Sequence, residues 1–267
     1  GFKDCKVALD ENYGDIEQSI EFLRKKGIAK ASKKMSRTAS EGLALAKEDK
    51  GEISLIEINS ETDFVAKNVD FINFCKELSE INFNIKSDLT KLNESKMANG
   101  ILVKDNLVNL IAKIGEKITI RRAEYFDKSN GTNFFYVHSA IEKGIGKIIS
   151  VVKLDGAIKD DDIGTKIAMH VAALNPLAID KDGIDKKLVD KELEIIKAEI
   201  TNSGKPADMA EKISKGKISK FLNDNSLLNQ IWIMDPKKKV SDVLKEKSST
   251  KPLKVLNFVR YKVGEGV

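Results

Sequence analysis

The chain has 267 residues, 41% hydrophobic and 33% charged, which is enough for a sizeable core and more than one compact unit. Its 46 basic and 41 acidic residues leave a net charge of +5 with the two signs interspersed, and only 6% of residues are aromatic, so we expect no direct contact with nucleic acid. No apolar run is long enough to span a bilayer, and no charged-then-apolar signal opens the chain, so we expect no membrane partner.

Two short helices are predicted in residues 1–27. The apolar stripe of the first consists of Phe2, Cys5, Ala8 and Leu9. Asp15 can cap the second helix with Gln18 in capping-box register, and Gly27 is a suitable stop. Two helices of this size cannot bury both stripes alone, so we expect a preceding third element or support from elsewhere. Residues 28–40, rich in Ala, Lys and Ser, are predicted to be a basic linker.

The pattern then changes to strands. Two apolar runs, 43–45 and 53–58, flank a turn-like segment at 47–51 and predict a β-hairpin. The apolar phase slips between Leu55 and Ile56, so we expect a bulge or burial on both faces. A helix should follow, with a stripe of Phe71, Phe74, Cys75 and Leu78. Less distinct helices are predicted within 82–110, and further strands at 118–120, 134–137 and 148–154.

A second strand-then-helix pattern follows. Its helix should open at 160–162 and end at 175–176, with a stripe of Ile163, Ile167, Val171 and Leu174. This repeated order suggests two similar subdomains. Near-heptad apolar spacing in 185–222, broken at 204–206, predicts an antiparallel helical hairpin. The alternating tail, 253–263, is predicted to be a strand.

These patterns predict an α+β protein in five parts. They are an N-terminal helical module (1–27), a basic linker (28–40), a first core subdomain (41–125), a second core subdomain (126–184 with 223–267), and a protruding coiled-coil-like helical hairpin (185–222).

Few residues suggest catalysis. Cys5 and Cys75 each lie in an apolar stripe, so we expect two buried free thiols rather than a disulfide. With His138 and His170 as the only histidines, we expect no metal site. Residues 144–147 come nearest to a phosphate-binding loop but lack its first Gly and its Ser or Thr. We therefore expect no cofactor and no enzyme activity, and favour a binding or regulatory protein.

Seven segments, in order along the chain, resemble the elongation factor Ts family. The most specific is 59–68, Asn-Ser-Glu-Thr-Asp-Phe-Val-Ala-Lys-Asn. The others are 4–9 with 14–16 and 23–27, 114–117 with 121–122, 136–138, 167–173 with 175–176, 204–206, and 263–266. The resemblance implies a ubiquitin-associated-like N-terminal module, whose first helix would precede this sequence, and two core subdomains with antiparallel sheets. It also implies a C-terminal helix after Val267.

The resemblance also implies a function. Members of this family are guanine nucleotide exchange factors that bind elongation factor Tu, GDP-bound or nucleotide-free, and promote GDP release by disturbing its Mg²⁺ and phosphate site, so that GTP can bind during translation elongation. The exchange tip would be Thr62, Asp63, Phe64 and Val65, and further partner contacts would come from Met169, His170, Cys5, Lys6 and Leu9.

Spacing alone favours plainer roles for some of these residues. From spacing alone, Phe64 is more typical of a hydrophobic staple over the following helix, with Asp63 as a turn or cap residue. His170 is more typical of a satisfied, partly buried histidine, and His138 of a structural one. The helical hairpin can be a helix pair with one solvated face, or can contact another domain of the partner.

Other functions stay open on the residues themselves. One is an adaptor that binds the same partner without accelerating exchange. Another is an RNA-binding scaffold that uses Lys33, Lys34 and Arg37 of the linker. A hydrolase or transferase is disfavoured because no catalytic constellation is evident. We expect a cytoplasmic protein, with an organelle matrix as the alternative.

Overall fold

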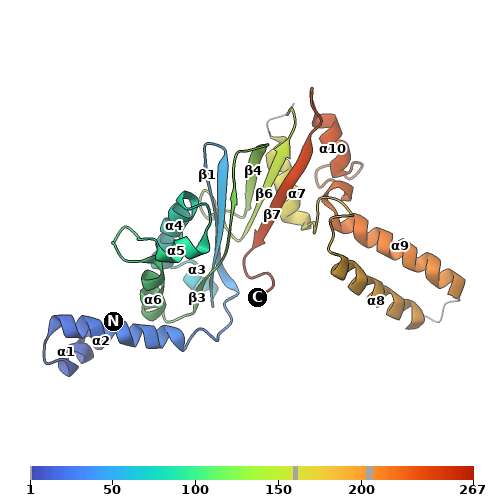
Figure 1. Cartoon of the computed structure of the whole chain (residues 1–267). Helices are drawn as coiled ribbons and strands as arrows, with labels where there is room; N and C mark the ends of the chain where they lie inside the picture. The colour runs from blue at the N-terminus through green and yellow to red at the C-terminus, as the bar shows by residue number, and fades with distance from the viewer. Residues whose placement is uncertain (1, 159–161, 203–206) are drawn as a thin grey trace. The chain divides into compact units, whose positions relative to one another are not determined.

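A computed structural model describes residues 2–158, 162–202 and 207–267 (Figure 1). They form helices and two antiparallel sheets, which confirms the predicted α+β class. The chain divides into two compact units. Unit 1 contains Gly1–Asp127, Val137–Ile149 and Tyr261–Val267, and unit 2 contains Lys128–Tyr136 and Ser150–Arg260. The five-part division is finer than this one and stays a prediction. None of the helices in the described part of the chain combines the length and apolar character that a membrane crossing requires.

Unit 1 begins with two helices, α1 (Phe2–Glu11) and α2 (Ile16–Ser32). The Asp15 carboxylate caps α2 as predicted, because its Oδ1 accepts the Gln18 backbone N–H at 2.9 Å. The Gln18 side chain also donates to the second carboxylate oxygen at 3.2 Å. The predicted start of the second helix is therefore confirmed.

The predicted stop at Gly27 is wrong. Helix α2 continues through it, so the first five residues of the predicted linker 28–40 are helical. Gly27 faces α6 (Val103–Ile114), where an added Cβ would lie 3.5 Å from the Cβ of Ala112. Gly27 therefore lies at the close contact between α2 and α6 and does not end the helix. The Ala and Lys residues that follow it also favour a helical conformation.

Unit 1 contains a four-stranded sheet in the order β3-β2-β1-β5. Its strands are β1 (Glu41–Asp49), β2 (Glu52–Ser60), β3 (Ile118–Phe126) and β5 (Ile145–Gly146). β1 and β2 form the predicted hairpin, but the turn is only Lys50-Gly51 instead of 47–51. Both turn residues have positive φ, 50° and 83°, which is typical of a type I′ turn. β2 is buried on both faces, as the phase slip between Leu55 and Ile56 predicted.

One face of this sheet packs against helices (Figure 1). They are α3 (Asp63–Ala66), α4 (Val69–Asn84), α5 (Leu89–Glu94) and α6. The predicted stripe of α4 is confirmed, since Phe71, Phe74, Cys75 and Leu78 are buried in one cluster with residues of β1 and β2. This packing fixes where β2 ends and α3 begins.

Unit 2 contains most of a three-stranded sheet in the order β4-β6-β7. Its strands are β4 (Thr132–His138), β6 (Ile148–Asp155) and β7 (Lys254–Lys262). Helix α7 (Ile163–Leu174) buries most of its predicted stripe, although Leu174 is exposed. Asn175 ends α7 in the left-handed conformation, with φ of 46°. Of the predicted opening residues 160–162, the first two lie outside the described residues.

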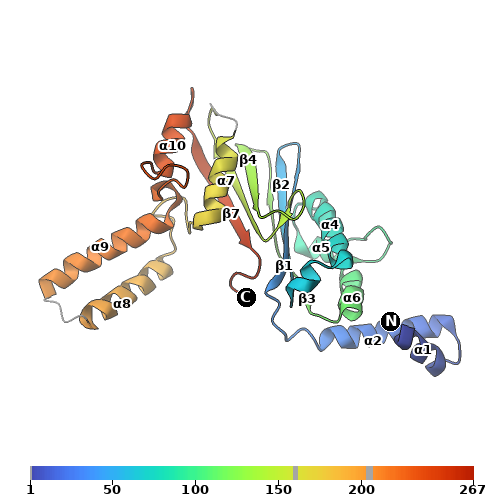
Figure 2. The ribbon, with the colours of Figure 1, turned by 180° about the vertical axis from the view of Figure 1, so that it is seen from behind.

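Two long helices, α8 (Lys186–Asn202) and α9 (Ala207–Asn225), lie side by side in both views (Figures 1 and 2). The predicted helical hairpin is therefore confirmed, and Ile196 and Ile200 are buried. The predicted break at 204–206 lies outside the described residues. A 3₁₀ turn η1 (Leu227–Asn229) and α10 (Val240–Lys247) complete unit 2.

Candidate functional site

The tip segment, Thr62–Val65, lies where β2 ends and the one-turn helix α3 begins. Phe64 is 79% exposed, while the next side chain, Val65, is 5% exposed and belongs to the hydrophobic core. The staple role that spacing allowed for Phe64 is therefore wrong, because a staple would be covered by the following helix. The buried Val65 anchors the turn, and its neighbour is presented to the outside.

A carboxylate between α6 and β3 holds the start of the tip segment. Glu116 Oε2 accepts the Thr62 backbone N–H at 3.0 Å, and Glu116 Oε1 accepts the Thr62 hydroxyl at 2.8 Å. The Ser60 hydroxyl donates to the Thr62 carbonyl at 3.0 Å. Thr62 is thus bound through its amide, side chain and carbonyl, which restricts the backbone that carries Phe64.

The residue before Thr62 makes the reciprocal link. Glu61 Oε1 accepts the Lys117 backbone N–H at 2.6 Å, and the Arg37 guanidinium lies 3.2 Å from Glu61 Oε2. Burial would raise the pKa of Glu61, but the Lys117 amide and Arg37 hold it below its usual value. Two consecutive residues of the loop that precedes α3 are therefore tied to the two residues that precede β3. Sequence reasoning missed this role of Glu116 and Lys117, although their segment was part of the resemblance.

Asp63 adds negative charge beside Phe64. Its carboxylate Oδ2 lies 2.7 Å from Lys67 Nζ, one helical turn later, and its side chain is about half exposed. The hydrogen bond from Lys67 lowers the pKa of Asp63, and the charge of Lys147 adds to this effect. The carboxylate is therefore ionised at neutral pH and is presented next to the exposed aromatic ring.

The N-terminal contact residues predicted from the resemblance all lie on α1. Cys5, Lys6 and Leu9 are exposed. The prediction that Cys5 is buried is wrong. Only Ala8 of α1 is buried, because α1 approaches α2 there and the Ser19 hydroxyl donates to the Ala8 carbonyl at 3.0 Å. The Cys75 thiol is buried as predicted.

His170 lies in the core of unit 2. It has no exposed surface, its Nε2 lies 3.0 Å from Gln230 Oε1, and its Nδ1 accepts the Ile233 backbone N–H at 3.4 Å. The imidazole stacks on the Trp232 indole with ring centroids 5.2 Å apart. This geometry favours the satisfied, structural histidine. Met169 beside it is half-buried and so partly accessible.

His138 is exposed at the end of β4. Among the described residues, no group of three or more His, Cys, Asp and Glu side chains could hold a metal ion. The site is thus a rigidly held turn that presents an aromatic ring and a carboxylate.

Comparison with known proteins gives a consistent match. The family model described as Elongation factor TS matches residues 61–265, which include most of the residues discussed above. An elongation factor Ts of Zymomonas mobilis is 39% identical, with 100% of this chain and 89% of that protein covered. Proteins of the same name from Azorhizobium caulinodans and Clostridium kluyveri are each 41% identical, with 100% of this chain and 88% and 89% of theirs covered.

Proposed function

Because the chain belongs to the elongation factor Ts family, we propose that it is a guanine nucleotide exchange factor for elongation factor Tu. It binds the GDP-bound partner, promotes GDP release by disturbing the Mg²⁺ and phosphate site, and lets GTP bind to the emptied partner during translation elongation. It forms and breaks no covalent bond.

The observation that carries this proposal is the exposure of Phe64. Its side chain is 79% exposed on a turn whose flanking residues are bound by Glu116 and Glu61. Exposing a large apolar side chain to water is unfavourable, and burying it against a partner would release this cost as binding free energy. Because the turn is already ordered, little further conformational entropy is lost on binding.

The pair formed by Asp63 and Phe64 suits the partner's metal site. Mg²⁺ requires near-ideal octahedral geometry and links a GTPase to the phosphates of its nucleotide. An aromatic wedge that shifts a neighbouring helix or loop of the partner by a small distance spoils that geometry. The ionised carboxylate of Asp63 adds like-charge repulsion toward the phosphates.

Exchange then follows from linkage. If this protein weakens the binding of GDP by some factor, GDP weakens the binding of this protein by the same factor. The complex without nucleotide is the state that this protein favours. GTP entering the empty site releases the factor, which is free to act again.

Further contacts with the same partner are proposed for residues of each unit. The exposed Cys5, Lys6 and Leu9 of α1 are accessible for docking, and so is part of Met169. Because the His170 ring is fully buried, its role is to hold the packing around Trp232 and Ile233 rather than to contact the partner directly. The relatives come from bacteria, which supports a cytoplasmic location over an organelle matrix.

The test is release of fluorescent GDP from elongation factor Tu. The wild-type protein should accelerate release, and an Asp63→Ala/Phe64→Ala double variant that still folds should have little effect. The matched control is Val69→Ala, which removes another exposed apolar side chain, 69% exposed, just after the tip segment. The proposal fails if the wild-type protein forms a complex with the partner but leaves the release rate unchanged, which would instead support an adaptor.

A further inference from the structure

A carboxylate buried in the unit 1 sheet has several partners. Glu57 on β2 has no exposed surface, yet four groups donate hydrogen bonds to it. They are Arg121 Nη1 at 3.0 Å, Arg122 Nε at 2.6 Å, Asn59 Nδ2 at 3.1 Å and the Gly264 backbone N–H at 3.0 Å. Burial would raise the pKa of Glu57, but these donors together hold it below its usual value. The side chain is therefore ionised and saturated.

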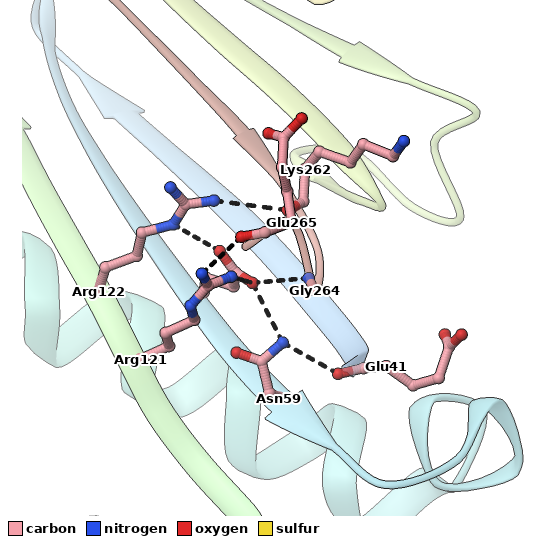
Figure 3. A network of polar contacts seen from close by, with 8 residues as sticks. Glu41, Asn59, Arg121, Arg122, Lys262, Gly264 and Glu265 are labelled. Carbon is pink, nitrogen blue, oxygen red and sulfur yellow. Dashed lines mark hydrogen bonds and ion pairs between the residues drawn. The ribbon is translucent and has the colours of Figure 1, made fainter. Parts of the chain in front are cut away.

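The two arginines reach one carboxylate because β3 has a bulge. Glu57 pairs with Arg122, whereas the next β2 residue, Ile58, pairs with Ile120, so Arg121 is the extra residue. Consecutive side chains of a regular strand point to opposite faces, and a bulge re-aims one of them. Figure 3 shows Arg121 and Arg122 extending to the same side of β3, toward Gly264. The bulge thus lets both arginines bind the Glu57 carboxylate.

The same cluster binds the C-terminal segment of unit 1. Arg121 Nη2 donates to the Glu265 carbonyl at 2.5 Å, and Arg122 stacks on the Tyr261 ring with 4.1 Å from the guanidinium carbon to the ring centroid. Gly264 has φ of 77°, and a Cβ there would lie 1.9 Å from the Ser40 carbonyl oxygen. Only glycine fits this approach. The segment is therefore fixed against the start of β1 as well as against the two arginines.

The bulge sets the pairing that leads to the tip segment. After it, the residues that pair are Ile58 with Ile120, Asn59 with Thr119, and Ser60 with Ile118. One step further, Glu61 accepts the Lys117 amide, and Glu116 binds Thr62. Without the extra residue, β3 would shift by one position, about 3.3 Å along the strand. Glu116 and Lys117 would then no longer meet Thr62 and Glu61.

A buried ion pair is weak evidence for stability, because desolvation offsets much of the attraction; its best-attested use is to specify register. We propose that Glu57, with Arg121 and Arg122, is a positioning cluster for the exchange tip: it holds the β3 bulge in register so that Glu116 and Lys117 fix Thr62 and Glu61. This inference rests on the proposed exchange function, since the tip is defined by it.

The first test measures the tip without the partner. Two variants loosen the cluster: Glu57→Gln removes the charge at equal volume, and Arg121→Lys keeps the charge without the forked geometry. Amide hydrogen exchange should become at least about tenfold faster at Thr62 and Lys117 in both variants, while the Leu45 amide in the β1–β2 pairing keeps its protection. Equal loosening at all three amides would mean that the cluster is merely structural and would overturn the inference.

The matched control is Asn82→Ala. Asn82 is fully buried, donates to the Leu55 carbonyl at 3.1 Å and contacts Ser87, which donates to the Glu124 carbonyl. Asn82 therefore joins β2 and β3 on the other side of the bulge. Its replacement should destabilise the fold without faster exchange at the Thr62 amide. Selective loosening of the tip by this control would also overturn the inference.

The second test measures GDP release from elongation factor Tu. Misplacing a functional group by about 1 Å can lower a rate by about 100-fold. The Glu57→Gln variant should lower the maximal release rate at least about tenfold, with little change in the concentration giving half-maximal release. A normal maximal rate in folded Glu57→Gln and Arg121→Lys would overturn the inference, whereas a wild-type protein that fails to accelerate release would overturn the exchange function itself. If Glu57→Gln does not fold, Arg121→Lys carries both tests.

Discussion

Lowering the pH should destabilise unit 2 through one residue, His170. Its Nδ1 accepts the Ile233 amide, so the proton of the neutral ring is on Nε2, facing Gln230 Oε1. A second proton would have to enter at Nδ1. It would break the bond from Ile233 and place a charge in an environment with no exposed surface, stacked on Trp232.

The sign and size of the effect follow from linkage. Burial lowers the pKa of His170, and the hydrogen bond with Gln230 only partly opposes this. The unfolded chain, with a histidine pKa of about 6.5, therefore binds the proton first as the pH falls. The stabilisation is fully present above about pH 6.5 and is lost toward the lower folded-state pKa, by at most about 1.4 kcal/mol per pH unit. Between pH 6.5 and 5.5 the loss should be at most about 1 kcal/mol, which is no more than roughly 0.3–1 M in urea midpoint.

The assay is urea unfolding followed by tryptophan fluorescence. Trp232 is the only tryptophan in the chain and lies against His170, so the signal reports the unit that contains the histidine. His170→Gln should be less stable at pH 7.5 but should lose the pH dependence between 6.5 and 5.5. The control His138→Gln, at an exposed strand end, should keep it. Parallel pH profiles for wild-type and His170→Gln proteins would refute the reasoning.

Three further predictions concern the tip and the thiols. Phe64→Ala should change the free energy of unfolding by less than about 0.6 kcal/mol, because only about a fifth of the Phe64 side chain is buried in the folded protein. The same variant should slow GDP release from elongation factor Tu, whereas Val69→Ala should not. Glu116→Gln should speed amide exchange at Thr62 by about tenfold, since a charged acceptor is replaced by a neutral one. A thiol reagent should label Cys5 in the native protein but Cys75 only after unfolding, and mass spectrometry can locate the label. The reason is that burial makes Cys75 inaccessible to the reagent and raises the pKa of its thiol.

Much of the fold could be predicted because its signals are local. The stripe of α4, the β1–β2 hairpin and the α8–α9 pair each follow from spacing within one or two elements. The errors concern residues whose roles depend on distant partners. Gly27 has the local character of a helix stop, yet it lies where α2 approaches α6. Cys5 lies in an apolar stripe, yet only Ala8 of α1 is covered.

The candidate site shows the same limit. Residues 59–68 could be singled out by resemblance, but the groups that hold them, Glu116 and Lys117, lie more than 50 residues further on. The link between Glu57 and Arg121-Arg122 depends on a bulge, and consecutive arginines suggest opposite faces of a strand. No sequence spacing predicts that a one-residue shift brings them together. Contacts of this kind are decided by pairing register, which a single sequence specifies only through the whole fold.

The exposure of Phe64 is best understood as a consequence of this register. A single helical turn of four residues is too short to be stable alone, so α3 persists because Val65 and Ala66 are buried below it and Glu116 binds Thr62 at its start. These contacts compensate for an aromatic side chain that is left in water. The same residues that orient the ring therefore also make its exposure tolerable. A partner that covers Phe64 gains most of the burial energy of the ring without first ordering the turn.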